Sequence, residues 1–453
     1  MIAPARRAAH RVLRSVHTGR SDLSTALARA RRPLEDTRDR ALAGEIAVGT
    51  LRWRAAVDHL LAQVSSRPIE DLDPEVRDLL RAASYQLRWL ERVPARAVVY
   101  DAVELAREFA PPGTDRFVNG VLRTLADARR PTSLPPRPDT SAGTKDRRAV
   151  LDYLSVTESH PRWLVERWLD RHGLAAASAW VRFNNKPAPV TLQANQLKGS
   201  TRDLADRLAA YGVQTAPARW APDALRVTAG LPLATPLTAE GRLLVQDEAA
   251  QLVMALVDAG RDTRVLDVCA APGGKTVGLA GAMANHGLLV AADLRPRRLA
   301  LLAATLARCG VRCGHVVRLD GTASLPFDAV FDRVLVDAPC SGLGTLRSDP
   351  DIRWRHEPKS LVALAAQQLT LLSQAAAIVR PGGILVYATC SSEPEENEET
   401  VGRFEAMRPD FTAVAPAESR FGRFIDPAGH FRTLPFRDGL QAFYAAVLRR
   451  HTL

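Results

Sequence analysis

Two cysteines, Cys340 and Cys390, each end a short apolar segment that has the length of a β-strand. The first segment is VLVDAPCSG (334–342) and the second is ILVYATCS (384–391). About one helix's worth of sequence separates them, which predicts two consecutive parallel strands of an α/β sheet. Ligands of such sheets bind at the carboxyl ends of the strands. We therefore expect both thiols to face one crevice.

A pair of thiols in a crevice suits chemistry at a pyrimidine carbon. Carbon 5 of cytosine is a poor nucleophile, but addition of a thiolate to C6 makes C5 enamine-like and able to accept a methyl group. The C5 proton then leaves and the thiol is expelled, a step that a second thiol can assist. A carboxylic acid near N3, such as Asp337, can hydrogen-bond the ring and support the adduct. Amino-group methylation needs no cysteine nucleophile, so the two thiols favour a carbon acceptor.

A glycine-rich segment, DVCAAPGGKT (267–276), follows another predicted strand and precedes a helix. Small residues let the backbone approach a ligand closely, and the helix N–H groups point at it. The spacing matches neither common glycine pattern for dinucleotides or triphosphates. Asp293 and Asp320 end the next two strands, where carboxylates can accept hydrogen bonds from a ribose. Each aspartate alone is more often a turn or cap residue, but together they indicate a nucleoside cofactor without a long phosphate tail, which S-adenosylmethionine fits.

Length, charge and cysteine content limit the class of protein. A chain of 453 residues predicts two or three domains. The net charge of +11 suggests a nucleic-acid partner, although 56 of the 61 basic residues are arginine, which could partly reflect genomic composition. No secretory signal or membrane-length apolar segment is present, so we expect a cytoplasmic protein that does not bind membranes.

The five cysteines are scattered and odd in number, unlike a disulfide framework. Cys309 and Cys313 stand four residues apart, a spacing that could suggest a metal, but no nearby His or Cys pair completes four ligands. We expect structural cysteines here and no metal. A disulfide between Cys340 and Cys390 is not expected in a reducing compartment.

The order of the predicted elements indicates a multidomain chain. Residues 1–130 show helical periodicity throughout and predict an all-α bundle with a net charge of +6, either a solvated surface or an RNA-binding face. Residues 131–147 are rich in Pro, Ser and Thr and predict a linker. Residues 148–240 predict a small α+β subdomain with an exposed polar turn at 182–186. Residues 241–453 alternate strands with helices and predict a doubly wound, mainly parallel α/β sheet.

Several motifs resemble those of RNA 5-methylcytosine methyltransferases of the Nop2/Sun type. They are DAPCSG (337–342), ATCS (388–391) with the following PEENE (394–398), and CAAPGGK (269–275). The segment FVNGVLR (117–123) resembles NusB-like domains. The combination is similar to bacterial small-subunit ribosomal RNA methyltransferases, with a Rossmann-like catalytic domain and RNA-binding accessory domains.

The resemblance implies roles for individual residues. Cys390 matches the family's nucleophile, Cys340 its product-release cysteine, and Asp337 the aspartate between cofactor and base. The S-adenosylmethionine contacts it implies are Cys269, Ala270, Ala271, Pro272, Gly273, Gly274, Lys275, Asp293, Arg298, Asp320 and Asp337. The segment at 436–447 departs from the family's Asp-Gly-Phe-Phe pattern, which leaves the pairing of the last strand open.

The resemblance also implies a partner. We expect a monomer that acts on RNA, and among RNAs on small-subunit rRNA. Two alternatives remain open. One is the same chemistry on transfer RNA or another rRNA site, and the other is a non-enzymatic, NusB-like RNA-binding or antitermination protein.

Overall fold

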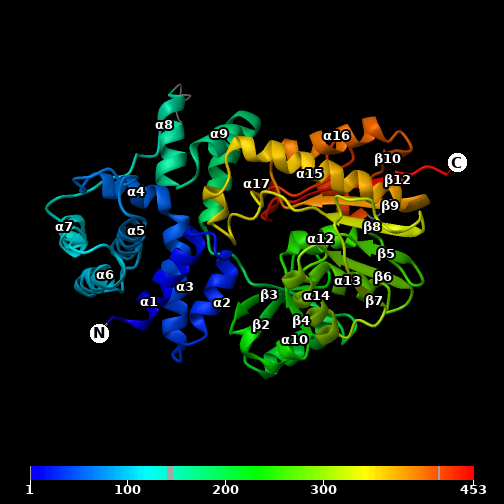
Figure 1. The fold of residues 1–453 in the computed structure, drawn as a ribbon, viewed down its shortest axis with the longest axis horizontal. Coiled ribbons are helices and arrows are strands. Elements are labelled where there is room, and N and C mark those ends of the chain that lie inside the picture. Colours follow the sequence, from blue (N-terminus) through cyan, green and yellow to red (C-terminus); the bar gives the residue numbers. More distant parts are fainter. Residues whose placement is uncertain (1, 140–145, 417–418, 453) are drawn as a thin grey trace. The chain divides into compact units, whose positions relative to one another are not determined.

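The computed structural model describes residues 2–139, 146–416 and 419–452 (Figure 1). Contacts divide the chain into two compact units, Met1–Lys186 with Leu346–Arg355, and Pro187–Thr345 with His356–Leu453. Residues 140–145 of the predicted linker lie outside the described residues. No helix among the described residues is long and apolar enough to cross a membrane.

The first unit is helical, as predicted. Its helices are α1 (Pro4–His17), α2 (Leu23–Arg31), α3 (Thr37–Arg52), α4 (Arg54–Ala62), α5 (Pro74–Trp89), α6 (Ala95–Phe109), α7 (Thr114–Ala126), α8 (Arg147–Asp152) and α9 (Arg162–Asn185). Asp36 and Asp73 cap α3 and α5 by accepting backbone N–H bonds, as expected of aspartate at an N-cap. The apolar stripe that continues from α3 into α4 is interrupted at Trp53, whose backbone (φ −101°, ψ 19°) is not helical.

Two features of the first unit differ from the sequence pattern. The expected exposed turn at 182–186 is wrong, because α9 continues through Asn185 and Asn184 is only 1 % exposed. The segment Leu346–Arg355, distant in sequence, belongs to this unit. It is held by the fully buried Arg353, whose guanidinium donates to the carbonyls of Arg52 (3.1 Å) and Ser159 (2.7 Å).

The second unit begins with a small antiparallel sheet of order β2-β3-β1-β4. Its elements are β1 (Thr191–Ala194), α10 (Thr201–Ala210), β2 (Gln214–Pro217), β3 (Ala224–Ala229), α11 (Pro236–Ala239) and β4 (Leu243–Val245). Helix α10 starts with a capping box between Ser200 and Asp203 and packs Leu204 and Leu208 against Leu192 and Leu225 of the sheet. An α+β segment is present, as expected, but its strands begin only at Thr191, and residues 148–186, expected in the same subdomain, belong by contacts to the first unit.

A larger sheet follows, with strand order β10-β12-β9-β8-β5-β6-β7 and β11 paired to β12. The strands are β5 (Arg264–Asp267), β6 (Leu288–Asp293), β7 (Gly314–Arg318), β8 (Phe331–Asp337), β9 (Val379–Thr389), β10 (Phe411–Ala413), β11 (Phe431–Arg432) and β12 (Tyr444–Arg450). Strands β5 to β9 pair in parallel, and β12 lies antiparallel to β9, which answers the open question of the last strand. The direction of winding reverses between β5 and β8, where doubly wound folds bind ligands.

Helices cover both faces of this sheet (Figure 1). They are α12 (Glu248–Ala255), α13 (Gly274–Ala282), α14 (Pro296–Cys309), α15 (Pro358–Ala377) and α16 (Glu398–Met407), and the short α17 (Pro435–Asp438) precedes β12. Successive strand residues point to opposite faces. Leu335 and Val386 therefore pack in the cluster that contains α12 and α13, whereas Val336 and Tyr387 pack in the cluster that contains α15 and α16.

Candidate active site

The reversal point of the larger sheet holds an ion pair. Asp337 is the last residue of β8, and Lys275 is the second residue of α13, which follows β5. The Lys275 Nζ lies 2.6 Å from Asp337 Oδ2. Burial lowers the pKa of the Lys275 ammonium, but the attraction of Asp337 outweighs burial, so the pKa is raised. The Lys275 ammonium is therefore charged at neutral pH, and the pair ties the glycine-rich loop to the strand that leads to Cys340.

The two thiols meet three residues beyond Asp337. Cys340 Sγ and Cys390 Sγ lie 3.2 Å apart, and both cysteines are free. The pKa of the Cys340 thiol is raised well above its usual range, first by its hydrogen bond to Cys390 and then by burial. The Cys340 thiol therefore stays protonated at neutral pH and can donate to the Cys390 sulfur. The parallel pairing of β8 with β9 brings the two loops together at one sheet edge.

A close backbone approach supports the loop that carries Cys390. The N–H of Gly344 donates to the Cys390 carbonyl (2.9 Å), and the Gly344 carbonyl accepts from the N–H of Ala442 (3.0 Å). A Cβ at position 344 would lie 1.9 Å from the Ala442 carbonyl oxygen and 2.8 Å from that of Cys390. Only glycine allows these three segments to meet.

A buried glutamate connects the two cysteine loops, and the sequence pattern did not reveal it. Glu396 lies in the 3-10 helix Pro394–Glu396 and is fully buried. It accepts hydrogen bonds from Ser341, which follows Cys340, and from Ser391, which follows Cys390. The acidic run at 393–399 is typical of a solvated first helical turn, so the position of Glu396 six residues after Cys390 was the available signal.

The glycine-rich loop runs from Cys269 to Gly273, the residue that caps α13 with φ +108°. Arg298 braces this loop, because its guanidinium donates to the Ala271 carbonyl and, over 3.0 Å, to Asp293 Oδ2. Asp293 ends β6 and also accepts from the N–H of Arg295 (3.1 Å). These contacts hold Asp293 at the same sheet edge as the loop.

Asp320 lies two residues beyond β7 and is more exposed than the other acidic residues of this edge. It accepts hydrogen bonds from the Thr322 hydroxyl (2.6 Å) and the Thr322 N–H (2.9 Å). These bonds, the hydroxyl bond first, lower the pKa of Asp320. Its carboxylate is therefore ionised and oriented at neutral pH.

Buried acids make this edge favourable for a cationic ligand. Burial first, and then the nearby Asp267, Asp337 and Asp293, raise the pKa of the Cys269 thiol to about 12, so this thiol stays protonated at neutral pH. Burial raises the pKa of Asp267 to about 7. Asp267 Oδ2 accepts from the Thr276 hydroxyl (2.7 Å), whereas its Oδ1 is buried without a hydrogen-bond partner in the described chain. A sulfonium or ammonium group and ribose hydroxyls fit this set of acceptors.

The remaining cysteines lie away from this chemistry. Cys309 is buried beside Leu302 and Leu306, and Cys313 is buried in a cluster with Leu289. Among the residues that the structure describes, no group of three or more His, Cys, Asp or Glu side chains is arranged to hold a metal ion.

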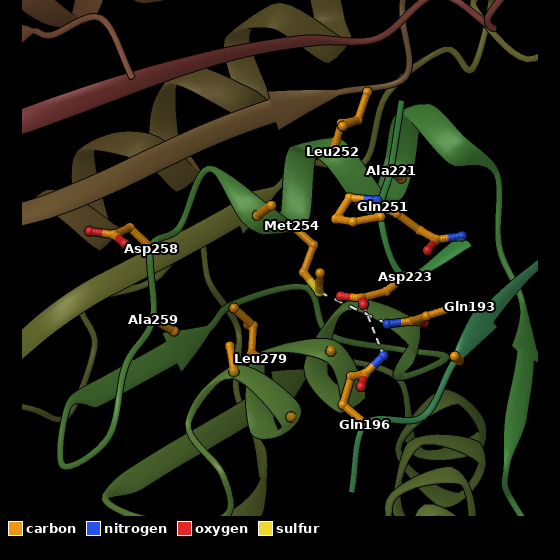
Figure 2. A pocket seen from close by; sticks show the side chains of 16 residues that line it. Gln193, Gln196, Ala221, Asp223, Gln251, Leu252, Met254, Asp258, Ala259 and Leu279 are labelled. Carbon is orange, nitrogen blue, oxygen red and sulfur yellow. Dashed lines mark hydrogen bonds between the residues drawn. The ribbon is translucent and has the colours of Figure 1, made fainter. Parts of the chain in front are cut away.

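A separate pocket of about 230 Å³ lies in the second unit (Figure 2). Its lining includes Gln193 of the small sheet, Asp223, Gln251 and Met254. Gln193 Nε2 contacts the Met254 sulfur at 3.9 Å, and Gln196 Nε2 donates to Asp223 over 2.9 Å. None of the site residues expected from the sequence lines this pocket, so it is distinct from the edge that holds the two thiols.

Comparison with known families divides the chain in the same order. A model described as "16S rRNA methyltransferase RsmB/F" matches residues 253–449, the NusB family matches 3–127, and an RsmF/B-like ferredoxin-like domain matches 160–234. A structure titled "Crystal Structure of PH0851" has the same fold, with a TM-score of 0.84, 24 % identity and 99 % coverage of both chains. The fold and these matches define an S-adenosylmethionine-dependent RNA methyltransferase.

Full-length relatives identify the family. The probable ribosomal RNA small subunit methyltransferase B of Bacillus subtilis is 34 % identical over 91 % of both chains. The ribosomal RNA small subunit methyltransferase B of Pseudomonas putida is 34 % identical over 89 % of both chains. The chain therefore belongs to the RsmB/F family of 16S rRNA methyltransferases. The resemblance drawn from its motifs, including the NusB-like domain, is confirmed.

Proposed function

We propose that this protein transfers a methyl group from S-adenosylmethionine to carbon 5 of a cytosine in small-subunit rRNA, through a covalent bond between Cys390 and C6. The observation that carries the proposal is the meeting of two free thiols, 3.2 Å apart, at the strand ends beside Asp337. Methylation of an exocyclic nitrogen would require neither thiol. The names of the full-length relatives support the choice of rRNA.

In this mechanism the Cys390 thiolate adds to C6 and moves electron density to C5. The bound cofactor supplies the electrophilic methyl group. Asp337, in its carboxylic acid form, donates a hydrogen bond to the ring at N3, where the addition builds up negative charge, and the neighbouring Lys275 ammonium stabilises that charge. A solvent water molecule then takes the proton from C5. The C5–C6 double bond re-forms, the bond between C6 and sulfur breaks, and Cys340 assists release by donating its proton to the departing Cys390 sulfur.

The cofactor is assigned to the edge formed by β5, β6 and β7. Residues 269–275 would present backbone and small side chains to it, and Asp293 and Asp320 would accept hydrogen bonds from its ribose and adenine portion. Arg298 contributes indirectly, because its guanidinium holds both Asp293 and the Ala271 carbonyl in place. Asp337 lies where the cofactor and the target base meet.

The N-terminal unit offers a groove for RNA whose lining carries three arginines together with Glu104 and Asp127. A hollow of about 600 Å³ between α6 and α7 is lined by Arg96, Tyr100, Arg107 and Arg123 among others. Arg107 pairs with Glu104 and Asp115, whereas the side chains of Arg96 and Arg123 make no hydrogen bond or ion pair within the described chain. Tyr100 is 52 % exposed and can stack on a base. We assign this groove to the RNA backbone and one unstacked base.

Replacing both Arg96 and Arg123 by alanine is expected to weaken RNA binding about tenfold near physiological salt. The slope of log affinity against log salt should also become shallower by roughly 1.4, because each lost contact with a single-strand phosphate contributes about 0.7 to that slope. Filter binding at several salt concentrations measures both quantities. Arg107→Ala is the matched control, because this arginine is already neutralised by two carboxylates. Equal losses in the control and the double variant would contradict the assignment.

The reaction itself is tested by bisulfite sequencing of rRNA from a strain that lacks the gene. We expect one small-subunit cytosine that resists conversion in the parent strain to become convertible in the deletion strain. Purified protein with labelled cofactor should restore 5-methylcytosine at that position, on either naked RNA or the assembled particle. Restored methylation only in transfer RNA would favour the alternative substrate, and a product methylated on nitrogen would rule out the proposed chemistry.

A further inference from the structure

Glu396 is a buried carboxylate without a cationic partner. It is fully buried at the end of the 3-10 helix Pro394–Glu396, and no ion pair in the described chain includes it. A buried charge of this kind needs several hydrogen bonds to offset its loss of hydration. The hydrogen-bond donors around the Glu396 carboxylate therefore show which segments of the chain this side chain holds in place.

Four donors reach this carboxylate. Oε1 accepts from the Ser341 N–H (2.8 Å) and from Gln368 Nε2 (2.9 Å). Oε2 accepts from the Ser341 hydroxyl (2.5 Å) and from the Ser391 hydroxyl. Three of the four donors thus belong to Ser341 and Ser391, the residues directly after Cys340 and Cys390. One side chain bonds both cysteine loops at once.

The surrounding hydrogen bonds fix Glu396 in turn. The Tyr387 hydroxyl donates to the Glu396 carbonyl (2.6 Å). Gln368 Nε2 also donates to the Pro339 carbonyl (3.0 Å), directly before Cys340. Asn397 donates to the Ser391 carbonyl (3.1 Å) and accepts from the Thr389 hydroxyl (2.6 Å). The network extends from α15 to both strand ends and leaves the carboxylate one orientation.

We propose that Glu396 is a positioning residue that clamps the loops after β8 and β9, so that the sulfurs of Cys340 and Cys390 meet at the same target base. The catalytic consequence rests on the proposed two-cysteine mechanism, whereas the thiol geometry does not depend on it. The negative charge also acts on Cys340. After the hydrogen bond to Cys390, burial and the charge of Cys390, it contributes to the raised pKa of that thiol.

The geometry can be measured without RNA by a bifunctional bimane that becomes fluorescent when two neighbouring thiols alkylate both of its arms. Cys340→Ala provides the blank for signal from other cysteines. Glu396→Gln keeps the shape of the side chain but replaces one acceptor oxygen by a donor that faces other donors. We expect it to lower the Cys340-dependent bridging rate about tenfold or more, and Ser391→Ala, which removes one bond, to lower it about threefold.

Glu248→Gln is the matched control. The backbone N–H groups of Trp220 and Ala221, in the same unit, both donate to Glu248 Oε1, so this substitution removes the charge of a hydrogen-bonded carboxylate while the amide oxygen can keep both bonds. We expect this variant to leave the bridging rate unchanged. If Glu396→Gln does not fold, Ser341→Ala and Ser391→Ala test the same clamp one bond at a time.

The catalytic arm compares steady-state methylation by the same variants. Since a displacement near 1 Å can cost about 100-fold in rate, we expect kcat of Glu396→Gln to fall by about that factor, with KM changed less than about threefold. Unchanged bridging in folded Glu396→Gln and both serine variants would overturn the clamp. If bridging is slower in Glu396→Gln but the wild-type protein methylates no cytosine, the clamp stands and the proposed function is rejected.

Discussion

Replacing Cys390 by alanine is expected to abolish methyl transfer, with kcat reduced by at least about 10³-fold, because loss of a covalent nucleophile removes the whole route through the intermediate. Without addition to C6, carbon 5 remains too weak a nucleophile to accept the methyl group. Transfer of a labelled methyl group to rRNA measures the rate, and denaturing gel electrophoresis should show no protein–RNA adduct.

A buried cysteine elsewhere provides the control for this variant. Cys313→Ala removes a buried thiol directly before β7, an edge strand that β5 and β6 separate from β8, so we expect some loss of stability and an unchanged kcat. Residual activity of Cys390→Ala within about tenfold of the parent protein would be incompatible with Cys390 as the nucleophile, since enzymes that lose a nucleophile retain far less activity.

Replacing Cys340 by alanine is expected to have the opposite signature. Addition and methyl transfer proceed, but release stalls, because the thiol that lies 3.2 Å from the Cys390 sulfur can no longer donate to it. We expect a protein–RNA adduct that survives denaturation and carries the labelled methyl group, with about one methyl group transferred per enzyme molecule. Gel electrophoresis of labelled reactions detects this species directly.

The double variant Cys340→Ala, Cys390→Ala is the decisive control, because it should form no adduct. If the roles of the two cysteines were exchanged, the adduct would instead accumulate in Cys390→Ala and be absent from Cys340→Ala.

Much of the fold could be predicted from local sequence. Helical periodicity and aspartate caps identified the N-terminal bundle, and strand-length apolar runs that alternate with helices identified the parallel sheet. Local sequence patterns were less informative where tertiary contacts determine whether a residue is buried or which unit a segment joins. Asn184 looks like a residue of a polar turn, but it is buried beside His160, with its Nδ2 3.2 Å from His160 Nε2. Segment 346–355 carries no signal that it belongs with the N-terminal helices.

The sequence by itself determined the chemistry that is available to this protein. The features that indicate this chemistry are local, and the covalent chain sets their spacing. They are two cysteines at the ends of apolar segments, an aspartate three residues before the first cysteine, and a loop of small residues after another strand. Tertiary structure alone decided how these groups meet. The sulfur–sulfur distance depends on the register of β8 against β9, and the Lys275–Asp337 pair on the order of strands. The role of Glu396 depends on burial, because the same acidic run would be an ordinary solvated helix start if water reached it.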